Sequence, residues 1–161
     1  MTDTSPAQPR ERIFLVVVDE TEEMRVALRY AALRAFHTGG KVALLCVIEP
    51  PGVQMSKALE ERMEEERREE AEQLISKLTA EVKETCGTVP IVYIREGRRR
   101  DELLALVAEE PSISVLVLAA GTGPEGPGPL ITTLIGKTVQ LRVPITIVPG
   151  SLTDEQVAAL A

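Results

Sequence analysis

Two features of the sequence combine residue types and positions that suit ligand binding. Asp19 directly follows an apolar run, Ile13–Val18, and a loop rich in glycine and proline, residues 121–129, follows a second apolar run that ends at Ala120. Asp19 supplies a carboxylate that accepts hydrogen bonds. The glycines let the backbone approach a ligand closely and point N–H groups at it. These two features predict a binding crevice with Asp19 on one side and the loop on the other.

Each feature also has a purely structural interpretation. Asp19 is a good N-cap for a helix that starts near Thr21, because its side chain can accept from the first free backbone N–H groups. The glycines of the loop can simply turn the chain. The loop also contains three prolines, which offer no N–H donor but stiffen it and so lower the cost of ordering it on binding. They are Pro124, Pro127 and Pro129. Both interpretations remain open at this point.

The residues favour binding over catalysis. His37 is the one histidine in the chain, and it stands at the end of the first predicted helix, where a cation suits the helix dipole. The two cysteines, Cys46 and Cys86, lie in apolar or helical contexts and predict buried thiols. Three acids crowd the start of the first helix, where they suit the dipole, with Mg²⁺ binding as the alternative; they are Glu20, Glu22 and Glu23. The expected protein is therefore not an enzyme, with a weak ATPase as the alternative.

A basic cluster follows the third predicted strand and contains Arg95, Arg98, Arg99 and Arg100. If that strand is at the edge of the sheet, these arginines lie two strands away from the crevice. We expect a solvated patch whose arginines pair with Glu96 and Asp101, and Asp101 also suits the cap of the next helix. An anion or partner site is the main alternative, and an RNA site is a further one.

Composition narrows the class of partner. The chain has 161 residues, a net charge of −7 and only 2% aromatic residues. A negative net charge and scarce aromatic rings argue against binding nucleic acid, which needs cations and stacking surfaces. No apolar run reaches the roughly 18 residues of a membrane span, and the polar residues 1–11 lack the apolar segment of a signal peptide. We therefore expect a cytoplasmic protein that begins with a flexible tail.

Apolar runs that alternate with helical patterns must position these residues. The predicted strands are residues 13–18, 42–48, 89–94, 113–120 and 143–148, and the predicted helices include 54–86 and 130–141. This alternation predicts an α/β fold: one doubly wound, five-stranded parallel sheet of order 3-2-1-4-5 with helices on both faces. A ligand would bind beyond the carboxyl end of the first strand, where the strand order reverses.

The domain is expected to span residues 12–150, followed by a short helix within residues 151–161. Thr153 and Gln156 have the spacing of a capping box at the start of that helix. Val157 and Leu160 are the residues expected to face inward.

The assembled order resembles the universal stress protein family from Ile13 to about Pro149. The resemblance rests on five segments in sequence: Val16–Thr21, Leu44–Glu49, Val92–Gly97, Val115–Ala119 and Val143–Val148. It implies a small cytoplasmic protein that is often a homodimer paired through its last strand. It also implies that ATP or another adenine nucleotide can bind, and that the protein acts through partners or its dimer state.

The resemblance assigns roles to individual residues. Asp19 would bind the adenine or ribose end, and Val47 would offer backbone groups and an apolar wall to the base. Gly121, Gly123 and Gly126 would present amides to the phosphates. The end of the phosphate chain would meet Gly136, Lys137 and Thr138, since Gly123, Gly126 and Gly136 fit the spacing G-x₂-G-x₉-G by count.

One departure from the family pattern favours a second possibility. Lys137 stands where nucleotide-binding members have Ser or Thr, with Thr138 one residue later. A lysine can contact phosphate as a point charge but lacks the geometry of a hydroxyl. The alternative is therefore a dimeric scaffold of the same fold whose nucleotide site has degenerated.

Overall fold

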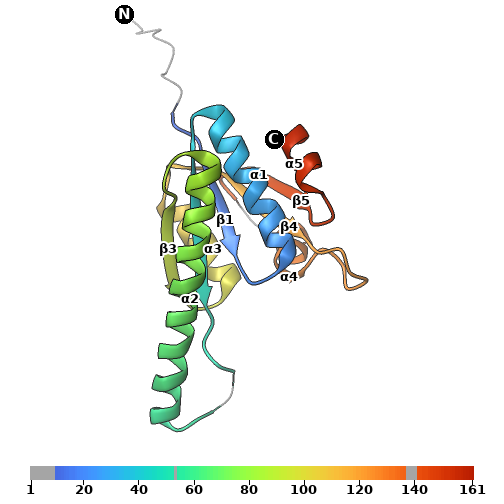
Figure 1. Ribbon diagram of the computed structural model, residues 1–161. Coiled ribbons are helices and arrows are strands. Elements are labelled where there is room, and N and C mark those ends of the chain that lie inside the picture. The colour runs from blue at the N-terminus through green and yellow to red at the C-terminus, as the bar shows by residue number, and fades with distance from the viewer. Residues whose placement is uncertain (1–9, 53, 137–140) are drawn as a thin grey trace, which may run out of the picture.

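The computed structural model describes residues 10–52, 54–136 and 141–161. Within these ranges the chain forms a five-stranded parallel sheet in the order β3-β2-β1-β4-β5, with helices on both faces (Figure 1). The predicted fold class and strand order are confirmed. The strands are β1 (Ile13–Val18), β2 (Lys41–Ile48), β3 (Ile91–Glu96), β4 (Ile113–Ala120) and β5 (Ile145–Pro149).

The centre of the sheet is apolar because helices cover both of its faces. Every residue of β1 is buried, as are the six inner residues of β2. Strand β1 pairs in parallel with both neighbours, Val18 with Cys46 of β2 and Val16 with Val117 of β4. The carboxyl ends of β1, β2 and β4 therefore meet at one edge of the sheet, and the segments that follow them surround a common space.

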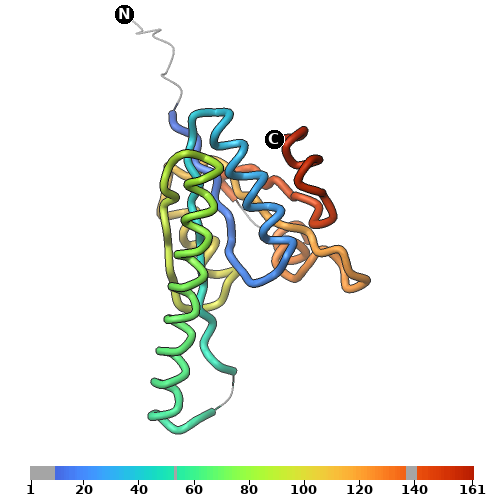
Figure 2. Tube along the Cα trace, viewed as in Figure 1, coloured from blue at the N-terminus to red at the C-terminus, as the bar shows by residue number. Residues whose placement is uncertain are grey.

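Three helices cover one face and two cover the other. The first group is α1 (Glu22–Thr38), α2 (Lys57–Cys86) and α5 (Asp154–Leu160), and Figure 2 shows α1 and α2 side by side in front of the strands. The second group is α3 (Arg99–Glu109) and α4 (Pro129–Gly136). Alternate residues along each strand feed two separate hydrophobic clusters, one under each group of helices.

Helix α2 is longer than the sheet that it covers. Its buried residues begin only at Ala71, and the segment before it extends past the carboxyl ends of the strands (Figure 1). The charged run from Glu64 to Glu70 lies on this segment. Seven charged residues in a row, about two turns of helix, leave no apolar side to pack on a core. This explains why the segment projects into solvent.

Several boundaries differ from the sequence prediction. Strand β3 begins two residues later than residue 89 and β5 two residues later than residue 143. Helix α4 ends at Gly136, and the rest of the predicted helix falls largely on residues 137–140, which lie outside the described residues, as do residues 1–9 of the predicted tail.

The final helix begins as predicted, with a capping box between Thr153 and Gln156. Val157 is buried, but Leu160 is 63% exposed, so its predicted inward position is wrong. Val157 is the one buried residue of this short helix. None of the helices in the described ranges is long and apolar enough to cross a membrane.

Candidate functional site

Three adjoining cavities lie at the carboxyl ends of β1, β2 and β4. The central cavity, of about 410 Å³, lies between the ends of β1 and β2 and helix α2. The β4 cavity, of about 190 Å³, lies between β1, β4 and residues 127–131. The arginine cavity, of about 540 Å³, lies between residues 49–52, the start of α3 and α4. Arg99 lines all three cavities, and Asp19 lines the central cavity and the β4 cavity.

Asp19 is held in place by the residue that starts α1. Its Oδ1 accepts from the backbone N–H of Thr21 at 2.8 Å and also from the Thr21 hydroxyl. Thr21 is the N-cap of α1, and its Oγ1 accepts from Met24 N at 3.3 Å. The interpretation that Asp19 itself caps the helix is therefore wrong. Within the described ranges Oδ2 of Asp19 has no hydrogen-bond partner, so one carboxylate oxygen is available to a ligand.

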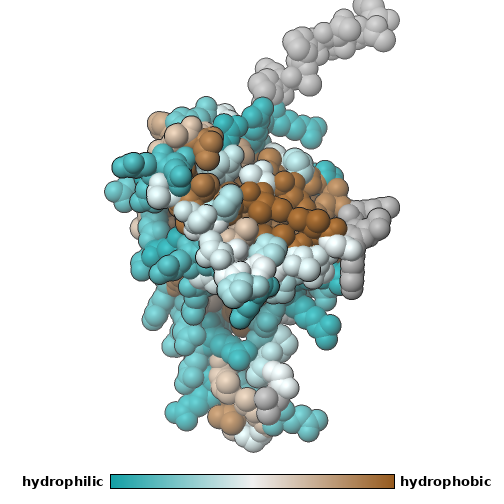
Figure 3. Space-filling model, turned by 90° about the vertical axis from the view of Figure 1, so that its right-hand side faces the viewer, coloured by the Kyte–Doolittle hydropathy of each residue, from teal (hydrophilic) through white to brown (hydrophobic). Residues whose placement is uncertain are grey.

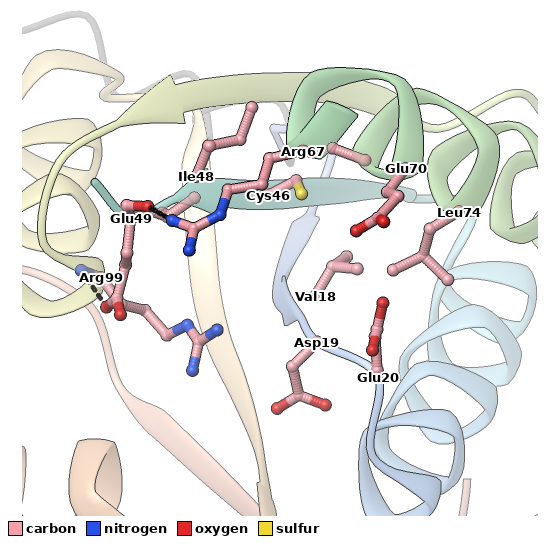
Figure 4. Close-up of a pocket in the computed structure, with 12 residues that line it drawn as sticks. Val18, Asp19, Glu20, Cys46, Ile48, Glu49, Arg67, Glu70, Leu74 and Arg99 are labelled. Carbon is pink, nitrogen blue, oxygen red and sulfur yellow. Dashed lines mark hydrogen bonds between the residues drawn. The ribbon is translucent and has the colours of Figure 1, made fainter. Parts of the chain in front are cut away.

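The floor of the central cavity is apolar and its rim is charged. Val18, Cys46 and Val47 form the floor, and Ala71 and Leu74 of α2 form one wall. Charged side chains stand around them, and Figure 4 shows those of Asp19, Glu20, Glu49, Arg67, Glu70 and Arg99. Burial raises the pKa of the Cys46 thiol, an effect that the positive charge of Arg99 partly offsets. A neutral thiol at the bottom keeps the floor compatible with a flat, weakly polar ligand.

Glu49 ties the two arginines of the central cavity to the end of β2. Its backbone carbonyl accepts from Arg67 Nη1, and its Oε1 accepts from the backbone N–H of Arg99 at 3.2 Å (Figure 4). The Arg99 guanidinium extends into the crevice on the side opposite Glu70, and its Nε is shielded from solvent and has no hydrogen-bond partner among the described residues. A buried, unpaired donor is costly unless a ligand supplies an acceptor.

The prediction that the basic cluster lies two strands away from the crevice is wrong for Arg99. Strand β3 is at the edge of the sheet, as expected, but α3 must cross beneath β2 and β1 to connect β3 with β4. Its first turn therefore lies under the end of β2, next to the crevice. The crossover direction, which follows from the predicted strand order, was the signal that could have located Arg99.

The remaining contacts of the cluster also differ from the prediction. Arg95 pairs with Glu109 at 2.5 Å and Glu102 at 3.8 Å, whereas Glu96 pairs with Arg68 of α2. Asp101 lies inside the first turn of α3, whose N-cap is Arg98, so Asp101 is not the cap. Arg98 and Arg100 are exposed, as predicted for a solvated patch, but the predicted pairs with Glu96 and Asp101 are wrong for Arg95, which is half-buried and pairs with other glutamates.

The glycine loop reaches the crevice with its second half. Residues 127–129 line the β4 cavity, but none of the three glycines predicted to bind phosphate lines any of the three cavities. The Gly121 N–H donates to Pro127 O at 2.9 Å and the Gly126 N–H donates to Gly123 O at 3.3 Å. Two of the three predicted amide donors thus make hydrogen bonds within the loop, and the binding role of Gly121, Gly123 and Gly126 stays a prediction.

Of the predicted end of the phosphate site, Gly136 alone lies within the described residues, and it lines none of the three cavities. Gly136 is the last residue of the eight-residue α4, whose first residue lines the β4 cavity. The nearest residue of α4 that lines a cavity is Thr133, in the arginine cavity, three residues or about 4.5 Å earlier along the helix axis. Lys137 and Thr138 lie outside the described residues.

In the described part of the chain, residues suited to catalysis or metal binding do not gather in the crevice. In the ranges that the structure describes, no three His, Cys, Asp or Glu side chains are grouped so as to hold a metal ion. His37 lies in the last turn of α1, as predicted, with its Nδ1 3.1 Å from Ala161 O. That turn is at the opposite end of α1 from Asp19. The crevice thus offers hydrogen-bonding and charged groups around an apolar floor, which is chemistry suited to holding a ligand.

Comparison with known proteins places this architecture in a family. The model of the universal stress protein family matches residues 11–137. The fold is similar to that of universal stress protein UspA from Lactobacillus plantarum, at 16% identity, with a TM-score of 0.74 over 87% of this chain and 99% of that one. It is also similar to a universal stress protein from Archaeoglobus fulgidus in complex with dAMP, at 18% identity, with a TM-score of 0.56 over 86% of this chain and 97% of that one.

A third similar structure is a universal stress protein family protein from Arabidopsis thaliana with AMP bound, at 12% identity, with a TM-score of 0.58 over 91% of this chain and 95% of that one. A search of curated protein sequences gave no match. At these identities the solved structures show a common fold, and the family model covers most of the chain. The chain belongs to the universal stress protein family.

Proposed function

We propose that this protein binds an adenine nucleotide, ATP or AMP, in the crevice and acts as a nucleotide-binding protein, without a catalytic role. The observation that carries the proposal is the position of Asp19 between the central cavity and the β4 cavity, with one carboxylate oxygen held by Thr21 and the other available. Fixing a side chain before the ligand arrives lowers the entropy cost of binding.

The lining of the central cavity suits a nucleoside. A carboxylate can accept hydrogen bonds from ribose hydroxyls, and Asp19 offers Oδ2 for this contact. An adenine ring would lie against the apolar surface formed by Val47 and its neighbours, with Leu74 on the other side. Burying an aromatic ring there is favourable by roughly 25 cal/mol per Å² of apolar surface removed from water.

The similar structures support the same proposal. The Archaeoglobus fulgidus protein is in complex with dAMP and the Arabidopsis thaliana protein has AMP bound. Both ligands are adenine nucleotides with a single phosphate. These proteins share the fold of this chain, so their ligands support the proposal of an adenine nucleotide.

We further propose that the protein forms a homodimer through β5. This strand is at the edge of the sheet, where its backbone N–H and C=O groups are open to pairing with a second strand. Its Ile147 is 38% exposed, and the side of the molecule that carries β5 has a hydrophobic patch (Figure 3). Nucleotide binding would then be sensed by a partner through the dimer.

One observation favours the alternative, a dimeric scaffold with a degenerate site. The amides of Gly121 and Gly126 are already bonded within the loop, so the loop offers few donors to a phosphate chain. A scaffold of this kind would dimerise but would bind no nucleotide at millimolar concentration.

Calorimetric titration with AMP and ATP tests the proposal. Asp19→Asn keeps the acceptor that holds Thr21 but removes the negative charge, so it should fold normally and bind AMP more weakly by about tenfold or more, the loss of one charged hydrogen bond. Asp154→Asn is the matched control, because Asp154 is an exposed carboxylate at the start of α5, away from the crevice. Equal affinity of the Asp19→Asn variant and the parent would remove Asp19 from the site, and no heat with either nucleotide would favour the scaffold.

A further inference from the structure

The arginine cavity is the positively charged part of the crevice. It is lined by three arginines, Arg98, Arg99 and Arg100, and by one carboxylate, Glu49, so its formal charge is +2. Its other lining residues are uncharged. An anion that entered this cavity would meet more positive than negative charge.

The other two cavities have the opposite character. The central cavity contains four carboxylates, Asp19, Glu20, Glu49 and Glu70, against two arginines, and its formal charge is −2. The β4 cavity contains Asp19 and Glu23 against Arg99, and its formal charge is −1. Close charges of like sign repel strongly in a partly dehydrated site. A nucleoside suits these two cavities, whereas a chain of phosphates does not.

The three arginines are not committed to other partners in the described part of the chain. None of their guanidinium groups has a carboxylate oxygen within 4.0 Å among the described residues, whereas the guanidinium of Arg95 in the same cluster pairs with two glutamates. Arg99 also has its Nε buried without a hydrogen-bond partner. A guanidinium offers five N–H donors in a plane and binds phosphate oxygens in pairs.

Backbone geometry adds to the positive potential. Helices α3 and α4 both begin at this cavity, with Arg98–Arg100 and Pro129–Leu130 as lining residues. The amino-terminal end of a helix carries a partial positive charge. The arginine side chains and the two helix dipoles thus both make the electrostatic potential in this cavity more positive.

We propose that the arginine cavity is a polyphosphate subsite: it takes the β- and γ-phosphates of a nucleotide whose base and ribose occupy the central cavity. This inference rests on the proposed nucleotide-binding function and assigns the phosphate contacts to the β3–α3 connection in place of the glycine loop. Arg99 lines both cavities and therefore stands at the junction, where the α-phosphate would pass. The crevice then selects ATP over AMP through the arginines.

The test compares AMP, ATP and inorganic tripolyphosphate by calorimetry with the full chain. The variant is Arg98→Gln/Arg100→Gln, because these two residues line only the arginine cavity among the three and glutamine removes the charge while keeping a polar, unbranched side chain. The control is Arg62→Gln/Lys77→Gln, which removes the same charge from exposed positions of α2. Circular dichroism checks that all three proteins have the same fold and unfolding temperature.

The expected result is that the parent and the control bind ATP about tenfold or more tightly than AMP, as one to two charged contacts imply. The Arg98→Gln/Arg100→Gln variant should keep its affinity for AMP and lose most of this preference for ATP. Unchanged ATP affinity in a folded variant overturns the subsite and leaves the proposed function intact.

The tripolyphosphate arm separates the two claims. If neither nucleotide binds but tripolyphosphate binds the parent and not the variant, nucleotide binding is refuted and the anion subsite is upheld. If tripolyphosphate and ATP bind the parent and the variant equally, the phosphates lie elsewhere and the subsite is refuted.

Discussion

Arg142 holds the end of α3 to the segment before β5, and its removal should destabilise the fold measurably. Its guanidinium donates to Val107 O and Glu110 O at 2.9 Å each and to Ile113 O at 3.2 Å, with a longer contact to Pro111 O at 3.5 Å. The Val107 and Glu110 carbonyls belong to the last turn and C-cap of α3, where a helix has no internal donors left for its carbonyls and where a positive charge suits the dipole.

The size of the effect follows from these contacts. A hydrogen bond from a charged donor contributes about 1.5–3 kcal/mol when buried. These carbonyls can be rehydrated after Arg142→Ala, so we expect a total loss of about 1–2 kcal/mol in the free energy of unfolding. For a domain of this length that loss lowers the unfolding temperature by about 2–8 °C.

Urea denaturation followed by circular dichroism measures the change. The slope of the unfolding free energy against urea should stay constant, since the surface exposed on unfolding is unchanged. Arg142→Lys should give an intermediate loss, because an ammonium cannot reach all of these carbonyls at once. The control is Arg62→Ala, an exposed arginine of α2. A loss for Arg142→Ala no larger than the roughly 0.5 kcal/mol of an ordinary surface substitution would refute the reasoning.

Three further outcomes are expected. Gly40→Ala should lower the unfolding temperature, measured by calorimetry, because the added Cβ would lie 2.3 Å from the Arg12 carbonyl oxygen and the backbone must move. The Cys46 thiol, whose pKa is raised by burial, should react slowly with thiol reagents at neutral pH, and more slowly still with bound nucleotide. The hydrogen bond from Arg95 lowers the pKa of Glu109, so an NMR titration of Arg95→Ala should show this pKa rising toward its usual value. In the parent, the contribution of the Arg95–Glu109 pair to the free energy of unfolding should be lost only as the pH falls below the usual glutamate range.

The fold could be predicted almost completely because its signals are local and mutually consistent. A strand such as Ile13–Val18 is apolar at every position, so both of its faces must be covered, and helices cover them. The handedness of the crossovers then leaves few strand orders. Element ends were less predictable, because residues such as Val89 are apolar but 55% exposed and do not join the sheet.

The candidate site was predictable only where a residue lies next to the end of its strand. Asp19 directly follows β1 and Val47 lies one residue before the end of β2, and both line the central cavity. Arg99 belongs to a helix that follows an edge strand, and its position depends on the path of that helix beneath the sheet. The internal hydrogen bonds of the glycine loop were also beyond prediction, because prolines at three positions leave many ways to arrange the remaining N–H groups.

The net charge of −7 argues against a large polyanion as a ligand, but it says little about a nucleotide. Charges on exposed surfaces are screened over about 8 Å at physiological ionic strength. Many acidic residues of the chain lie on α2, including the part that projects past the sheet, so they bear on the approach of a long, rigid polyanion across the surface. Once a small anion is inside the arginine cavity, the three arginines and Glu49 are the formal charges lining it. An acidic protein can therefore contain a polyphosphate subsite, provided that its arginines are gathered by the fold, as α3 gathers them here.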